Sequence, residues 1–204
     1  MGAITSKVAD SADDASRNKW DDNILLPANS NIVGCISGVT KKYGCGMRFN
    51  DIAIPKSTPI SSAFITFTAA SSTSGANCLS KICAEAVDNA ETFANDKVVF
   101  DTRFANVTDK ITWNNIGEWT ANSTYNSPEL KTIIQLIINR AGWSSGNSIV
   151  IFWEDFDNLS VYVAGNYREA YSYNGSTTKA PVLNIIFSSA KGSNISKLIA
   201  VGMI

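Results

Sequence analysis

The segment 60–68 alternates between two kinds of side chain along its whole length. Ala63, Ile65 and Phe67 are apolar and fall on one face of an extended chain, whereas polar residues such as Thr66 fall on the other face. This period of two is typical of a strand in an antiparallel sheet with one face buried. A chain with such a strand needs a second layer to cover the buried face.

Short apolar runs with similar properties recur along the chain and are separated by turn-forming residues. They occupy residues 31–38, 47–54, 78–87, 97–100, 111–113, 149–153, 159–163, 167–173 and 181–187. The run 149–153 is apolar on both faces, so we expect it to be covered from both sides. Many short strands at turn-punctuated spacing predict an all-β protein, an antiparallel jelly-roll β-sandwich.

A single helix is predicted, over about 128–141. Ser127 is a favourable N-cap, Pro128 suits the first helical position and Gly142 suits the end. The apolar residues between them recur at helical spacing and form one stripe. We therefore expect a short amphipathic helix that lies against the sandwich.

The predicted strands and helix place the domain at residues 31–188. Residues 1–30 show no clean periodicity and are rich in aspartate, which predicts an N-terminal arm with Trp20 and Leu25 as anchors. Residues 189–204 form a C-terminal tail. Its apolar residues would be a liability if exposed, which suggests that they dock on another subunit. With the two anchors, the residues expected to mediate assembly are Leu198, Ile199, Val201, Met203 and Ile204.

Charge and hydropathy exclude several partners. The net charge is -1 and the basic residues form no run, so we expect no nucleic-acid binding. No apolar stretch approaches the ~18 residues of a membrane-spanning helix, so we expect no membrane insertion. The first residues lack the pattern of a signal peptide, which predicts synthesis in the cytoplasm without signal-dependent export.

The chain contains no histidine, and this restricts the possible chemistry. Catalytic sites of the Ser-His-Asp and Cys-His types are excluded. Seven carboxylates were considered for a glycosidase-type pair, and their spacing fixes no pair at a cleft. They are Glu85, Asp88, Glu91, Glu154, Asp155, Asp157 and Glu169. We therefore expect a protein that is not an enzyme.

The four cysteines have spacings that do not suit a zinc site. Two interpretations remain. All four are small buried thiols, or Cys35 and Cys45 face each other across a hairpin. The first interpretation is preferred.

Two groups of residues are candidates for ligand binding. Glu154, Asp155 and Asp157 concentrate oxygen ligands in a loop and suggest a structural calcium ion; no other cofactor is expected.

The second group is a row of tyrosines. Tyr167, Glu169, Tyr171 and Tyr173 share one strand face by the period of two. An aromatic face with a nearby carboxylate is suited to stacking on a sugar, so this row is the candidate glycan site.

Seven segments, taken in order, resemble a known family. They are 46–56, 60–68, 84–90, 113–119, 127–146, 167–175 and 180–183. Together they are similar to the DNRLRE-type and disaggregatase-related domains, which are jelly rolls similar to carbohydrate-binding modules. The resemblance covers roughly residues 31–188. The chain departs from the family at Asn174, where other members often have aspartate before glycine.

The resemblance implies a module of extracellular or surface proteins, or a single-domain structural protein of a phage. Together with the arm, the tail and the missing signal peptide, it predicts a non-enzymatic virion structural protein. Such a protein would be a capsid decoration, head-fibre or tail-associated component that self-associates or binds other virion proteins and reaches the outside by lysis. The alternative is an extracellular carbohydrate-binding β-sandwich module that recognises a cell-surface glycan.

Overall fold

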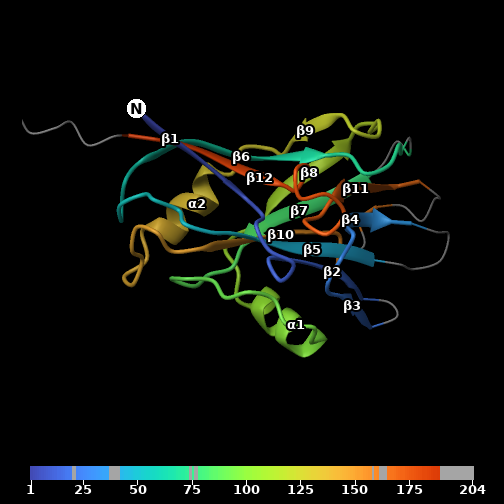
Figure 1. The fold of residues 1–204 in the computed structure, drawn as a ribbon, viewed down its shortest axis with the longest axis horizontal. Helices are drawn as coiled ribbons and strands as arrows, with labels where there is room; N and C mark the ends of the chain where they lie inside the picture. Colours follow the sequence, from blue (N-terminus) through green and yellow to red (C-terminus); the bar gives the residue numbers. More distant parts are fainter. Residues whose placement is uncertain are drawn as a thin grey trace, which may run out of the picture.

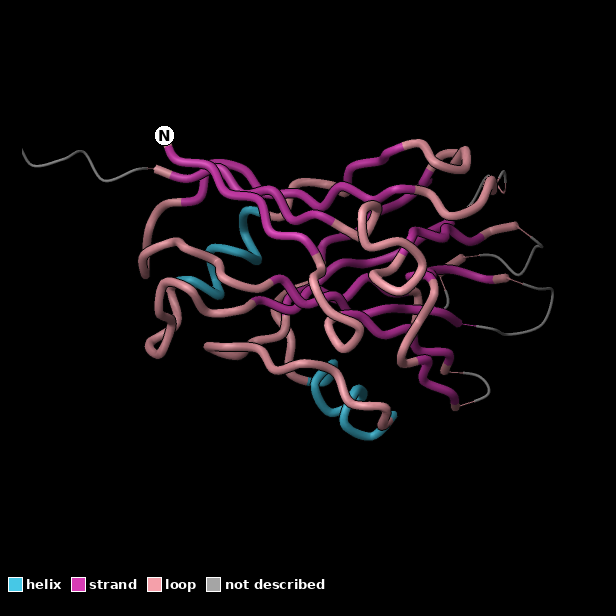
Figure 2. Tube along the Cα trace, in the orientation of Figure 1, coloured by secondary structure: helices cyan, strands magenta, loops and turns pink. Residues whose placement is uncertain are grey.

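The fold was analysed in a computed structural model, which describes residues 1–19, 22–36, 42–73, 75, 78–157, 159–160 and 165–188. Strands outnumber helices among these residues (Figures 1 and 2). The strands are β1 (Gly2–Lys7), β2 (Asp14–Asn18), β3 (Asn23–Leu25), β4 (Ser30–Cys35), β5 (Lys42–Phe49), β6 (Ile60–Thr68), β7 (Cys78–Ala84), β8 (Ile111–Ile116), β9 (Thr124–Asn126), β10 (Ile149–Glu154), β11 (Tyr167–Tyr171) and β12 (Val182–Phe187). The helices are α1 (Lys97–Ala105) and α2 (Lys131–Ile138).

Within the described residues, the strands form two antiparallel sheets. The small sheet has four strands in the order β1-β12-β6-β9. The large sheet has eight strands; six follow the order β11-β4-β5-β10-β7-β8, and β2 pairs with β5 and β3. The two sheets lie over each other with a core between them (Figure 1). The predicted antiparallel β-sandwich is confirmed, and its jelly-roll form stays a prediction.

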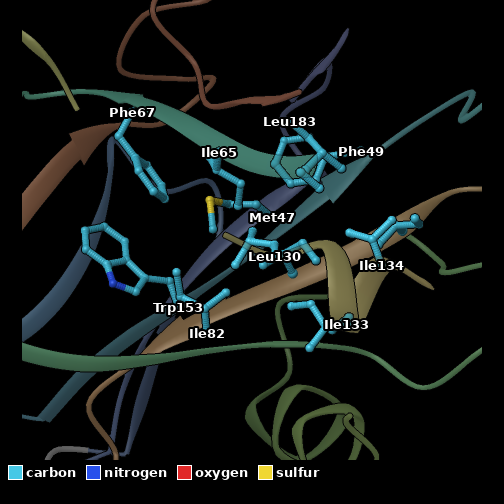
Figure 3. Close-up of a cluster of buried hydrophobic side chains, with 14 of the residues drawn as sticks. Met47, Phe49, Ile65, Phe67, Ile82, Leu130, Ile133, Ile134, Trp153 and Leu183 are labelled. Carbon is cyan, nitrogen blue, oxygen red and sulfur yellow. The ribbon is translucent and has the colours of Figure 1, made fainter. Parts of the chain in front are cut away.

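The core between the sheets comes from the inward face of each strand. Ile65 and Phe67 of β6 and Trp153 of β10 are fully buried there, as the alternation predicted for β6 requires (Figure 3). Phe67 and Trp153 have ring centroids 4.7 Å apart. Helix α2 adds Ile133 and Ile134 to the same core. Burial of this apolar surface is the main force that holds the two sheets together.

A second apolar cluster covers the other face of the large sheet. Val150 and Phe152 of β10 point away from the small sheet and pack with Phe93 and Phe100. Phe100 comes from α1, and its ring lies 5.3 Å from that of Phe152 (centroids). Strand β10 is therefore covered on both faces, as its continuous apolar run predicted.

The segment 1–30, predicted to be an arm outside the domain, is part of the sandwich. Strand β1 pairs with β12 from Gly2 to Lys7, and β2 pairs with β5. The prediction was wrong because Asp13 and the polar residues of β2 are buried and form hydrogen bonds with distant parts of the chain. Asp13, for example, accepts hydrogen bonds from Arg48 Nη1 and Asn50 Nδ2, both at 2.8 Å.

Helix α1 replaces the strand that was predicted to begin at Lys97. Asp96 caps it, because its Oδ1 accepts hydrogen bonds from the Val98 and Val99 amides at 2.8 and 3.2 Å. The fold therefore has two helices among the described residues, not one. Capping and the packing of Phe100 outweigh the β propensity of the two valines.

Helix α2 begins and ends inside the predicted range 128–141. Ser127 does not cap it, because Ser127 Oγ accepts the Ile65 amide at 3.0 Å and so binds the edge of β6. The Glu129 carboxylate likewise accepts the Ala63 amide at 2.7 Å. The residues before α2 thus continue the pairing of β9 along β6 and delay the start of the helix.

Candidate functional site

The predicted tyrosine row lies on β11, at an edge of the large sheet. Tyr167, Glu169 and Tyr171 are half-buried on the outer face, while Arg168 and Ala170 are fully buried on the inner face. This is the alternation that the sequence predicted. Tyr173 lies beyond the end of the strand and packs against the main core, so it does not continue the row.

The polar groups of the row are already engaged within the chain. Glu169 Oε2 accepts a hydrogen bond from Ser71 Oγ at 2.8 Å. The Lys179 ammonium lies 4.9 Å from the centroid of the Tyr171 ring and donates to Asn122 Oδ1 at 2.6 Å. One face of the Tyr171 ring is therefore occupied by the protein's own cation. Glycan binding by this row stays a prediction.

The predicted calcium ligands are already paired with lysines and with the backbone; Glu154 and Asp157 both face Lys110 Nζ, at 2.9 and 3.8 Å. Glu154 Oε1 accepts from Lys110 Nζ at 2.9 Å, and Asp157 Oδ2 accepts from Lys81 Nζ at 2.7 Å. Asp155 is turned to the backbone and accepts the amide of Ser160 at 3.0 Å. In the part of the chain that the structure describes, no group of three carboxylates or thiols is arranged to hold a metal ion. The predicted calcium set is corrected accordingly: these residues form ion pairs and turn contacts.

Two other carboxylates that are candidates for catalysis also form ion pairs within the chain. Both carboxylate oxygens of Glu85 accept hydrogen bonds from Arg103, at 2.9 and 2.7 Å. Asp88 Oδ1 accepts from Arg140 Nε at 2.7 Å. Bidentate and charge-assisted bonds of this kind fix the position of a carboxylate. They tie α1 and the loop after α2 to the segment 85–93.

The four cysteines are buried and unbonded to one another. Cys35 lies opposite Lys42 in the pairing of β4 with β5, not opposite Cys45, so the hairpin interpretation was wrong. Burial raises the pKa of Cys78 and of Cys83 to about 12, and it raises the pKa of Cys45 well above its usual value. These thiols are protonated at neutral pH and act as small apolar side chains.

Two buried polar centres were missed by sequence reasoning. Arg168 is fully buried and donates only to backbone carbonyls, which come from three separate segments. They belong to Gly75, Ile116, Gly117, Gly165 and Tyr167, at 2.5 to 3.5 Å. A single arginine in an alternating strand gives no signal of such a role, because its partners are distant backbone atoms.

The second missed centre surrounds Asp14 of β2. Its Oδ2 accepts hydrogen bonds from Asn31 Nδ2 at 3.2 Å and from the Tyr173 amide at 2.9 Å. Within the described part of the chain, Oδ1 of Asp14 and Oδ1 of Asn31 have no hydrogen-bond partner. Burial raises the pKa of Asp14 to about 6, because the low dielectric of the interior disfavours the charged carboxylate. A polar run in the sequence gave no hint of this burial.

The residues predicted to mediate assembly are placed only in part. Leu25 lies on β3, where 47% of its surface is exposed. Trp20, Leu198, Ile199, Val201, Met203 and Ile204 lie outside the described residues.

Comparison with known proteins adds no relative. No family model matches the chain, and no curated protein matches it. The resemblance to the DNRLRE-type and disaggregatase-related domains therefore stays a prediction. Among the described residues, no helix combines the length and the apolar character that a membrane crossing requires.

Proposed function

We propose that this chain is a non-catalytic structural protein that works by self-association through the edge strand β1. From the family resemblance we expect the protein to belong to a virion. We also expect its sandwich to have jelly-roll topology. The observation that carries the proposal is the position of β1 at one edge of the small sheet. Among the described strands, β1 pairs with β12 alone, over residues 2–7.

Among the described residues, strand β1 has little of the protection that is usual at a sheet edge. An edge strand presents unpaired N–H and C=O groups, and natural proteins guard such edges with charges, prolines or bulges. The residues of β1 are Gly-Ala-Ile-Thr-Ser-Lys, with one charge at the end and no proline. Its pairing with β12 runs from Gly2 to Lys7 without a shift of register. A second copy is a suitable partner for such an edge.

The alternation within β1 fits pairing across a two-fold axis. Ala3, Thr5 and Lys7 are exposed, whereas Ile4 packs against the main core. An antiparallel pair centred on Thr5 would place Ala3 opposite Lys7 of the second copy and join two small sheets into one. Such a contact is self-complementary, which is the usual form of a homodimer interface.

The carboxylates and thiols of the described residues support a structural role over a catalytic one. Glu85, Asp88, Glu154 and Asp157 form ion pairs, Asp155 holds a turn, and the buried thiols are protonated. A catalytic group needs a poised pKa and access to a substrate. Asp14 has a raised pKa, but it is enclosed by Asn31 and the Tyr173 backbone.

The proposal is tested by light scattering on the full chain and on the variant Thr5→Lys. Two lysines would face each other across the paired strands, so we expect the wild-type oligomer to dissociate to a monomer. The matched control is Thr124→Lys, an exposed threonine on β9 at the opposite edge of the small sheet. It should leave the mass unchanged.

A wild-type chain that stays monomeric at high concentration would contradict the proposal. Glycan-array binding by that monomer, lost in Tyr171→Ala, would instead favour the carbohydrate-binding alternative.

A further inference from the structure

The exposed side of α2 forms the wall of an apolar groove. The groove has a volume of about 400 Å³ and is lined by Ile60, Lys131, Thr132, Gln135 and Leu136. Leu136 is 49% exposed, although it lies in the same helix as the fully buried Ile134. An exposed apolar side chain at the wall of a groove indicates a surface suited to an apolar partner.

The central polar residue of the groove is already satisfied. Gln135 Oε1 accepts the Ile60 amide at 2.8 Å, and its Nε2 donates to the Thr58 carbonyl at 3.2 Å and to Asn139 Oδ1 at 2.9 Å. An amide that has used its oxygen and both hydrogens has little left to offer a ligand. The groove therefore recognises shape and apolar surface more than polar groups.

The described chain ends beside this groove. Phe187, the last residue of β12, is the register partner of Ile60, and the Ser188 amide donates to the Pro59 carbonyl at 2.9 Å. Figure 1 shows the end of β12 and helix α2 at the same end of the molecule. The segment that follows residue 188 thus begins next to one wall of the groove.

The sequence beyond this point supplies an apolar segment within reach. Residues 198–204 are Leu-Ile-Ala-Val-Gly-Met-Ile and carry no charged side chain. The nine residues 189–197 that precede them can span up to about 30 Å when extended. A segment tethered at so short a distance has an effective local concentration of the order of millimolar.

We propose that residues 198–204 occupy the α2 groove of their own chain. The apolar side chains of the segment cover Leu136 and Ile60 and remove both surfaces from water. The contact is intramolecular and does not depend on pairing through β1. The groove is then the docking site of the chain's own C-terminal residues, and not of a separate ligand.

The experiment compares the full chain with a chain that ends at Lys197. A fluorescein-labelled peptide of residues 194–204 is titrated with each protein, and binding is followed by fluorescence anisotropy. We expect the shortened chain to bind the peptide, and the full chain to bind it at least tenfold more weakly because its groove is occupied. In the shortened chain, Leu136→Asp should abolish binding.

The matched control is Val98→Asp in the shortened chain. Val98 is an apolar residue on α1 that is 65% exposed, so this variant should bind the peptide like its parent. A shortened chain that binds no peptide, or binds it equally well with Leu136→Asp, would overturn the proposal. Equal binding by the full and shortened chains would overturn it too.

A second measurement separates the same-chain contact from exchange between copies. Removal of residues 198–204 should lower the thermal midpoint by the same amount at low and at high protein concentration. A loss that grows with concentration, or a mass change on Leu136→Asp in the Thr5→Lys background, would show that a second copy supplies the segment. That outcome overturns the same-chain proposal. It does not bear on the pairing through β1, which the light-scattering experiment on Thr5→Lys tests separately.

Discussion

The two sheets differ in how far the outward face of a central strand is buried. In β10 of the large sheet, Phe152 points outward and is buried against the rings of Phe93 and Phe100. In β12 of the small sheet, Ile186 points outward and is 36% exposed. Among the described residues, the large sheet therefore has an apolar cluster on each face, while the small sheet has one on its inner face alone.

This difference assigns separate roles to the two sheets. Buried polar centres gather on the strands of the large sheet, as Arg17, Asp14 and Arg168 show. The features that suit contact with another surface lie at the small sheet and at α2, which packs against β6. Stability should thus respond most to changes in the large sheet, and association most to changes in the small sheet.

The largest effect is expected for Phe152→Ala. The change opens a cavity between the large sheet and α1, and large-to-small substitutions of this kind cost about 3–5 kcal/mol of unfolding free energy. Urea denaturation followed by tryptophan fluorescence measures the loss. A cost below about 1 kcal/mol would mean that the second cluster does not behave as a core.

A similar but smaller loss is expected for Arg168→Met, which keeps most of the side-chain volume. The carbonyls of Gly75, Ile116 and Gly117 lose their donor, and buried unpaired groups cost about 1–3 kcal/mol each when they find no water. We expect a total of about 3 kcal/mol, the low end of the range for three such groups. Arg168→Lys is the variant to compare with Arg168→Met. Lysine has three N–H donors where arginine has five, so Arg168→Lys should keep only part of the stability that Arg168→Met loses. Thermal unfolding of both variants would show whether this ranking holds.

A gain in stability is expected for Asp14→Asn at neutral pH. The folded-state pKa of Asp14 is raised to about 6, so its stabilising contribution is fully present below about pH 4 and is lost as the pH rises through 6. Ionisation of the folded carboxyl at pH 7.5 costs about 2–3 kcal/mol, which the amide avoids.

The stability difference between wild type and Asp14→Asn should shrink toward zero at pH 4. Unfolding free energies measured between pH 4 and pH 8 give the comparison. A difference that does not change with pH would contradict the role of ionisation.

The smallest effect is expected for Ile186→Ala on the outward face of the small sheet. We expect a change within about 0.5 kcal/mol, as for other exposed positions. Its neighbour Ile185 faces the main core and is 1% exposed, so Ile185→Ala should cost about 2–5 kcal/mol. Equal costs for the two neighbours would show that the outward face is covered in the folded protein.

Much of the β architecture could be predicted from local patterns. The alternation of 60–68 defines β6 to the residue, and the two-sided apolar run 149–153 indicates a strand with a cover on each face. The preferred interpretation of four buried thiols was also confirmed. In each case the side chain interacts with its nearest layer, so the period of the sequence carries the information.

Other elements were beyond prediction because their partners are distant in the sequence. The aspartates of 10–14 predict a solvated arm until Arg48 and Asn50 are brought beside Asp13. The start of α2 is decided by the edge of β6, which takes Ser127 away from the cap position. The predicted calcium set was wrong for the same reason, since Lys81 and Lys110, which pair with its carboxylates, come from elsewhere in the chain.

The sequence by itself determined the all-β class and the inward faces of the principal strands, because periodicity is a local property. Only the tertiary structure decided that the first residues form an edge strand and that Arg168 and Asp14 are buried. It also decided that an apolar groove opens where β12 ends. These features depend on which backbone atoms and side chains become neighbours, and pairing between distant segments fixes that.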